Sequence, residues 1–143
     1  MIYLDTSYIV KCYLREPGTD IVLNWLQGKS GLTCCLHGRL ELIAAFKRHV
    51  REGRLLEAHF LTSLKLLEKD ERAGIWQWIP VSSELIQKAC KHVASLHSTI
   101  FIRSADALHL ACAAENGFTF IYSHDRHLLG AAEHFGLEGK DIL

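Results

Sequence analysis

Four acidic residues of this 143-residue chain lie where a short apolar segment ends or a helix is expected to begin. Asp5 follows the apolar residues Ile2–Leu4, and Asp125 comes shortly after the segment "FIYS". Asp106 lies in the first turn of one expected helix, and Glu41 lies about one turn into the helix expected after "LTCCL". Because the carboxyl ends of parallel strands line one edge of a sheet, these four carboxylates can converge there.

Such a cluster would favour binding of a cation, because convergent carboxylates repel one another. Mg²⁺ and Mn²⁺ prefer oxygen ligands and retain bound waters, which suits an acidic pocket that also contains the hydroxyls of Thr6 and Ser7. These ions can bind a phosphodiester, lower the pKa of a bound water and stabilise the leaving oxygen. The pattern therefore predicts metal-dependent phosphodiester hydrolysis.

Each acid also has a structural interpretation when it is considered alone. Asp5 can cap a helix, Asp106 can complement a helix dipole, and Asp125 can begin a turn. Glu41 can be a solvated helix residue. Spacing leaves both interpretations open.

The elements that would position the acids follow from the alternation of apolar segments with helical patterns. Strands are expected at residues 2–4, 32–36, 75–81 and 118–123. Helices are expected at residues 7–16, 19–27, 38–51, 55–70, 82–97, 105–116 and 126–135. Thr6 or Ser7 is expected to cap the first helix, and Ser104 the helix at 105–116. Strands alternating with helices indicate parallel strands joined by crossover helices, in an α/β layered fold.

Length and composition indicate a single domain that spans residues 1–143, since 49% of the residues are hydrophobic and 22% are charged. Sixteen Lys and Arg balance 16 Asp and Glu, so a nucleic-acid partner would need a local basic patch. No segment approaches the ~20 apolar residues of a membrane span, and the first residues lack the regions of a signal peptide. We therefore expect a cytoplasmic protein that does not bind a membrane.

The five cysteines are expected to be free thiols, mostly buried, because their number is odd and no C-x-x-C motif occurs. Cys34, Cys35 and His37 are imaginable zinc ligands. Adjacent cysteines without a second cluster do not match a usual structural zinc site, so we set this interpretation aside.

Four segments of the chain form a specific combination. They are "IYLDTSYIVK", "RLELIAAF", "RSADALHLACA" and "FIYSHDRHLLGAA", and together they extend over almost the entire chain. In their order and separation they resemble the PIN-domain ribonucleases and, within these, the VapC-like toxins of type II toxin–antitoxin systems. The most specific feature is "ADALHLA" with an earlier "DTS" and a later "S-x-D-x-x-L".

The resemblance implies a three-layer α/β/α sandwich with a mainly parallel central sheet and Mg²⁺- or Mn²⁺-dependent endonucleolytic cleavage of RNA. It places the family's acidic quartet on Asp5, Glu41, Asp106 and Asp125, the same residues that strand-end reasoning selects. Ser7 aligns with a polar position that often supports the metal or phosphate, although its role as a helix cap stays open. The resemblance also implies a tRNA or rRNA substrate, a homodimer, and inhibition by a cognate antitoxin protein whose segment wraps near the active site.

Two further residues are candidates for contact with an RNA phosphate. The guanidinium of Arg103 matches phosphate oxygens in a bidentate way, but it can equally form an ion pair at the surface or a dimer interface. His124, just before the fourth acid, can contact phosphate or product, although an exposed loop histidine without a special role is the favoured interpretation.

A basic segment and three tryptophans are the remaining candidates for RNA contact. The basic residues are Lys47, Arg48, His49, Arg51 and Arg54, which can follow the RNA backbone or an acidic antitoxin segment, or form a solvated helix face. Trp25, Trp76 and Trp78 can stack on bases, but core or dimer contacts are the favoured interpretation.

Three hypotheses about function compete at this point. The first is a metal-dependent endoribonuclease that acts as a toxin and leaves 5′-phosphate and 3′-hydroxyl ends. The second is a metal-independent ribonuclease that uses histidines as acid and base and leaves cyclic phosphate ends, although the nine histidines form no clear paired motif. The third is a catalytically inactive PIN-like module that binds protein or RNA, against which the intact acidic quartet argues.

Overall fold

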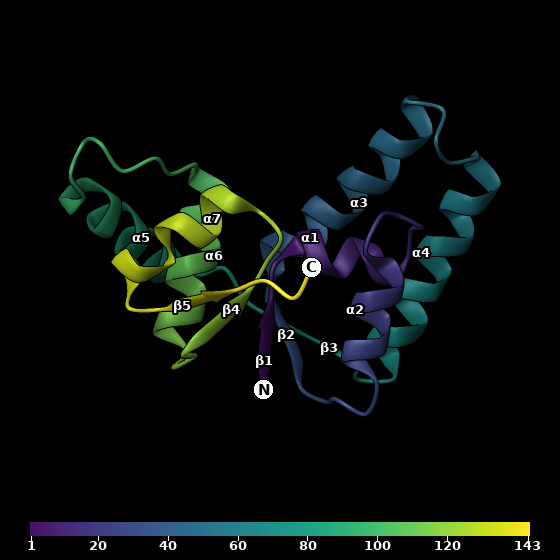
Figure 1. Cartoon of the computed structure of the whole chain (residues 1–143), viewed down its shortest axis with the longest axis horizontal. Coiled ribbons are helices and arrows are strands. Elements are labelled where there is room, and N and C mark those ends of the chain that lie inside the picture. Colours follow the sequence, from purple (N-terminus) through teal and green to yellow (C-terminus); the bar gives the residue numbers. More distant parts are fainter.

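A five-stranded parallel sheet forms the centre of the protein, for which a computed structural model describes residues 1–143 (Figure 1). The strands are β1 (Ile2–Leu4), β2 (Leu32–Cys35), β3 (Trp76–Ile79), β4 (Phe120–Tyr122) and β5 (Glu138–Lys140). Their spatial order is β3-β2-β1-β4-β5, and every neighbouring pair is parallel. The expected parallel sheet is confirmed.

Helices lie on both sides of this sheet, which completes the expected α/β/α sandwich (Figure 1). One layer contains α1 (Thr6–Ile9), the 3₁₀ helix η1 (Val10–Cys12), α2 (Thr19–Leu26), α3 (Leu36–Arg51) and α4 (Glu57–Arg72). The other contains α5 (Ser83–Ser95), α6 (Ser104–Glu115), α7 (Arg126–Ala131) and the 3₁₀ helix η2 (Ala132–Phe135). None of these helices has the length and apolar character needed to span a bilayer.

The central strand β1 supplies side chains to two separate apolar cores. Tyr3 packs with residues of α6 and α7 such as Leu110 and Leu128, on one face of the sheet. Leu4 packs on the opposite face with Leu42 and other residues of the first helical layer. Because successive strand residues point to opposite faces, a strand in the middle of such a sheet is apolar throughout.

The first helix is shorter than the sequence predicts, and its cap is a different residue. The chain forms α1 and then η1 instead of one helix over residues 7–16. The N-cap of α1 is Asp5, whose carboxylate accepts a hydrogen bond from the Ser7 backbone N–H. The prediction of Thr6 or Ser7 as the cap is therefore wrong, and the structural interpretation of Asp5 as a helix cap is confirmed. The β-branched and aromatic residues that follow have low helix propensity, which favours the short elements.

Two other local predictions also differ from the structure. Ser104 is the first residue of α6, and the N-cap position before it is held by Arg103 without a side-chain capping bond. The strand β5, which pairs with β4, was not predicted because its sequence "EGK" has no apolar alternation. Pairing with a neighbouring strand overrides the weak local preference of these three residues.

Gly38 allows the start of α3 to pack closely against β2 and α6. A Cβ atom at this position would lie 2.5 Å from Cys34 Sγ and 3.1 Å from His109 Cε1. Both neighbours are buried, so neither can move away easily.

We expect the substitution Gly38→Ala to lower the free energy of unfolding by about 1–3 kcal/mol, because it overpacks this contact. Gly130→Ala is the matched control, since that helical glycine in α7 has no atom within 4 Å of an added Cβ. The control should leave stability unchanged or raise it by up to about 1 kcal/mol. Urea unfolding of both variants measures the difference, and equal stability would contradict the packing argument.

Candidate active site

A cleft of about 620 Å³ lies at the carboxyl edge of the sheet, and all four acidic residues selected from the sequence line it. Asp5 stands between β1 and α1, and Asp125 stands between β4 and α7. Glu41 belongs to α3, and Asp106 lies in the first turn of α6. The structure therefore places the four side chains along one cleft, while their chemical roles stay a prediction.

Asp5 is held in place by a network of hydroxyl groups. Its Oδ2 accepts hydrogen bonds from Ser123 Oγ at 2.7 Å and from the Ser7 backbone N–H at 3.4 Å. Ser123 Oγ also accepts from the Asp125 backbone N–H at 2.9 Å, and Ser7 Oγ accepts from the His124 backbone N–H at 3.0 Å. The two serines thus tie the end of β1 to the loop after β4. Sequence reasoning had selected Ser7 but not Ser123.

Glu41 carries its hydrogen bonds on one carboxylate oxygen. Its Oε2 accepts from Thr6 Oγ1 at 2.7 Å and lies 2.7 Å from His109 Nε2. Its Oε1 lies 3.7 Å from His37 Nε2. Burial alone would raise the pKa of the Glu41 carboxyl, but the contacts with His109 and Thr6 outweigh burial and hold this pKa below its usual value. Glu41 is therefore ionised at neutral pH.

His109 of α6 is the main residue of the site that sequence reasoning missed. It is 1% exposed, and its Nδ1 lies 3.0 Å from the hydroxyl of Tyr3. Burial by itself would lower the pKa of His109, but the Cys34 sulfur, Glu41 and Asp5 together raise it above its usual value. A signal was present in the sequence, because His109 follows Asp106 by three residues and so shares its helix face.

Arg103 bridges the other two acids of the cleft. Its Nε donates to Asp106 Oδ2 at 2.7 Å, its Nη2 donates to Asp106 Oδ1 at 3.1 Å, and Nη2 also donates to Asp125 Oδ2. The ion-pair alternative for Arg103 is thus the one present in the structure. Burial would raise the pKa of the Asp125 carboxyl, but Arg103 and the backbone N–H groups at the start of α7 lower it below its usual value.

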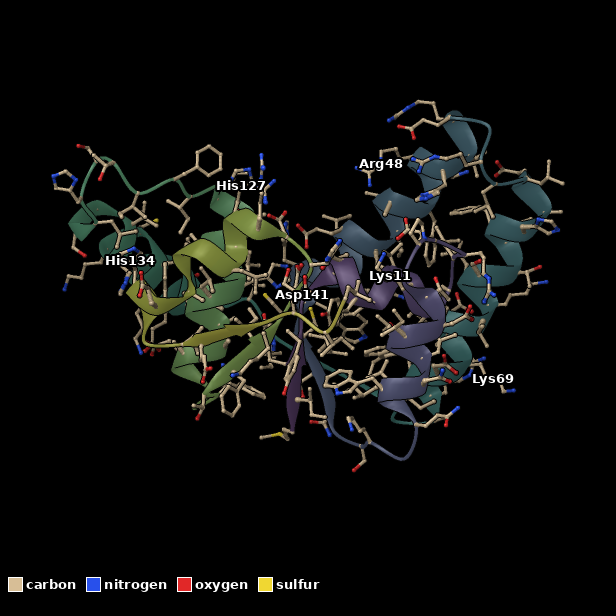
Figure 2. All side chains as sticks on the ribbon, in the orientation of Figure 1. Lys11, Arg48, Lys69, His127, His134 and Asp141 are labelled. Atoms are coloured by element: carbon tan, nitrogen blue, oxygen red, sulfur yellow. The ribbon has the colours of Figure 1, made fainter.

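His124 does not line the cleft. Its Nδ1 lies 2.8 Å from Asp141 Oδ2, and Asp141 Oδ1 accepts a hydrogen bond from the hydroxyl of Tyr8 at 2.6 Å. Asp141 is labelled near the centre of Figure 2, beside the carboxyl end of the sheet. The side chain of His124 therefore ties the loop after β4 to the segment after β5.

The basic segment is less available for RNA than the sequence suggests. Lys47 and Arg54 form ion pairs with glutamates, and His49 is buried against Glu16. Arg48 and Arg51 form no ion pair and line the acidic cleft. Figure 2 shows Arg48 on α3 in the upper part of the view.

The three tryptophans make internal contacts, as the favoured interpretation predicted. Trp25 packs on Tyr122 with ring centroids 4.6 Å apart. Trp76 is buried, and Trp78 donates a hydrogen bond to Glu71 at 2.8 Å.

The donor atoms of the cleft fit an oxygen-preferring divalent cation. Asp5 and Glu41 each offer a carboxylate oxygen, and these two oxygens and a nitrogen of His109 lie within 4.8 Å of one another, whereas Asp106 and Asp125 do not belong to this group. Carboxylate oxygens are the ligands that Mg²⁺ and Mn²⁺ prefer. No cysteine belongs to such a group, and the five cysteines are free, with three of them buried.

The parallel α/β sandwich and the acidic cleft at its edge agree with comparisons to known proteins. Residues 2–133 match the model of the PIN domain family, so the chain belongs to this family.

Two curated relatives come from Mycobacterium tuberculosis. Ribonuclease VapC47 of strain CDC 1551 / Oshkosh is 30% identical in an alignment 143 positions long, gaps included, which covers 95% of this chain and 93% of that protein. Ribonuclease VapC46 of strain ATCC 25618 / H37Rv is 26% identical in an alignment 138 positions long. This alignment also covers 95% of this chain and 93% of that protein.

The contact between Arg103 and Asp125 makes stability depend on pH. A carboxyl whose pKa is lowered by folding contributes stability above its unfolded-state pKa of about 3.9 and loses that contribution as pH falls through the folded-state value. We expect Arg103→Gln to raise the pKa of Asp125 and to lower the free energy of unfolding at pH 7 by at most about 1 kcal/mol, because the pair is partly solvated. The difference from wild type should shrink as the pH falls below about 4.

Carboxyl ¹³C NMR titration and urea unfolding at pH 7 and pH 3 measure these two effects. Arg126→Gln is the control, since Arg126 is the next residue after Asp125 but forms no ion pair. An unchanged pKa of Asp125 in Arg103→Gln would show that the ion pair is not the cause of the shift.

Proposed function

We propose that this protein is a metal-dependent endoribonuclease that hydrolyses RNA phosphodiester bonds and acts as the toxin of a toxin–antitoxin pair, inhibiting translation or growth. The observation that carries the proposal is the convergence of four carboxylates in one cleft of a PIN domain. Membership of the family and similarity to two proteins named as VapC ribonucleases support the RNA substrate.

Asp5, Glu41, Asp106 and Asp125 would hold Mg²⁺ or Mn²⁺ in the cleft. When bound, such an ion supplies Lewis acidity, which activates water and stabilises charge on the phosphate. Other residues of the chain hold the proposed ligands in position. Ser7 and Ser123 fix Asp5 relative to Asp125, and no histidine is required as a general base.

Positive side chains at the cleft favour approach of the RNA backbone. Arg48 and Arg51 have no carboxylate partner, so they are free to contact phosphates. Arg103 is held by two acids of the site, and it can contact phosphate from that position because half of its side chain is exposed.

The remaining partners rest on the resemblance to VapC-like toxins. The RNA would be a tRNA or rRNA recognised through shape and loop sequence. A cognate antitoxin would cover the cleft, and residues 1–143 would act as one nuclease domain in the cytoplasm and form a homodimer. His124 lies outside the cleft lining, so we assign it to loop positioning rather than to phosphate contact.

Cleavage of structured RNA by the antitoxin-free protein should require Mg²⁺ or Mn²⁺ and should stop in EDTA. We expect Asp5→Asn to lower the cleavage rate by about 100-fold or more, because it removes a charged metal ligand. Asp20→Asn is the matched control, since Asp20 is an exposed acid of α2 that pairs with Arg15. End analysis of the products should find 5′-phosphate and 3′-hydroxyl groups.

Two outcomes would contradict this proposal. Cleavage that persists in EDTA and leaves cyclic phosphate ends would indicate the histidine-based mechanism. Absence of cleavage for tRNA and rRNA, with retained RNA or protein binding, would indicate an inactive binding module.

An apolar groove between α5 and α6 suits the proposed homodimer. It has a volume of about 520 Å³, and Ile86 and Val93 of α5 line it although they are exposed in the monomer. Light scattering should give about twice the 16.2 kDa mass of one chain. We expect Ile86→Lys to yield monomers and Gln87→Lys, on the same helix but outside the groove, to have no effect. A monomeric wild-type protein would exclude the dimer.

A further inference from the structure

A chain of buried hydrogen bonds connects the backbone of β2 to Glu41. The backbone N–H of Cys35 donates to the hydroxyl oxygen of Tyr3 at 3.1 Å. The same hydroxyl lies 3.0 Å from His109 Nδ1, and His109 Nε2 lies 2.7 Å from Glu41 Oε2. Cys35, Tyr3 and His109 are all fully or almost fully buried, so water does not compete for these bonds.

The chemistry of the two end groups, a backbone N–H and a carboxylate, sets the direction of the chain. A backbone N–H can only donate, so the Tyr3 oxygen accepts there and its single hydrogen is free for His109 Nδ1. At the other end an ionised carboxylate can only accept, so the contact of 2.7 Å requires a hydrogen on His109 Nε2. Nδ1 then accepts from Tyr3 when the imidazole is neutral and donates to the Tyr3 oxygen when the imidazole is doubly protonated. In both states Nε2–H points at Glu41.

The two oxygens of Glu41 consequently differ. Oε2 accepts from both Thr6 and His109 at 2.7 Å. Oε1 has only a distant contact with His37, at 3.7 Å. A carboxylate oxygen that already accepts two short hydrogen bonds is a poor metal ligand, whereas its partner oxygen is available.

We propose that His109 is a positioning residue, held by Tyr3, that fixes Glu41 through Oε2 so that Glu41 binds a divalent ion through Oε1 alone. His109 does not bind the ion itself, although its Nε2 lies within 4.8 Å of the nearest oxygens of Asp5 and Glu41. This inference rests on the proposed metal site. It adds a function for three residues that the acidic quartet leaves without a role: Tyr3, Thr6 and His109.

Mn²⁺ binding to the full chain, followed by EPR, tests the proposal without measuring activity. Loss of a partner that orients a metal ligand typically weakens metal affinity by about 10–100-fold. We expect this loss in His109→Leu, and a smaller loss in Tyr3→Phe, which keeps the aromatic ring in the core. His109→Gln should restore affinity to within about 3-fold of wild type, because its amide N–H can still donate to Glu41.

Two controls distinguish a loss of Glu41 positioning from a general loss of folding. His92→Leu is the matched variant, since His92 also hydrogen-bonds through Nε2, to the backbone carbonyl of His134, but lies outside the cleft. It should bind Mn²⁺ as wild type does. Circular dichroism establishes which variants fold, and Tyr3→Phe and His109→Gln provide the test if His109→Leu does not.

A pulsed EPR spectrum of wild-type protein with ¹⁵N-labelled histidine decides whether His109 is a ligand. We expect no directly bonded histidine nitrogen on Mn²⁺, and a strong nitrogen coupling would overturn the proposal. Unchanged affinity in folded His109→Leu and Tyr3→Phe would also overturn it. A different result is expected if the proposed metal site itself does not exist. Wild type would then bind no Mn²⁺, or wild type and Asp5→Asn would bind Mn²⁺ with the same affinity.

Discussion

The cost of keeping carboxylates ionised in a partly buried cleft is the constraint on which the site depends. A parallel sheet places strand ends and helix starts at one edge, and here that edge collects Asp5, Glu41, Asp106 and Asp125. Burial of a carboxyl group raises its pKa unless positive groups or hydrogen-bond donors stabilise the ionised form. The chain provides that compensation from within, through Arg103 and His109.

The compensation is divided between the two sides of the cleft. Arg103 forms ion pairs with Asp106 and Asp125 on the solvent side of the cleft, where its side chain is about half exposed. His109 contacts Glu41 from inside the protein, where a hydrogen bond with Tyr3 holds the imidazole in place. The exposed side chain of Arg103 can move away when another cation arrives, whereas the buried side chain of His109 cannot. The contacts of Arg103 with Asp106 and Asp125 can therefore rearrange. The contact of His109 with Glu41 is fixed.

The location of the four acids along one cleft was predictable from sequence because its signal is local. Each follows a short apolar segment or begins a helix, and parallel topology then implies a shared edge. The spacing of His109 from Asp106 indicates a shared helix face, but the bonds from His109 to Tyr3 and Glu41 join residues 106 and 68 positions apart, which local spacing cannot pair. The strand β5 was missed for the same reason, since only its pairing with β4 makes "EGK" a strand.

The position of β1 in the middle of the sheet has a consequence for the newly made chain. β1 is synthesised long before β4, yet the two strands pair, with Tyr3 opposite Ile121. The bond between Asp5 and Ser123 likewise spans 118 positions. Contacts of such separation form late in folding because closing a long loop costs entropy. The acidic cluster therefore cannot assemble on a nascent chain that has not yet released residues 120–125 from the ribosome, so an unfinished copy of this protein carries no complete site.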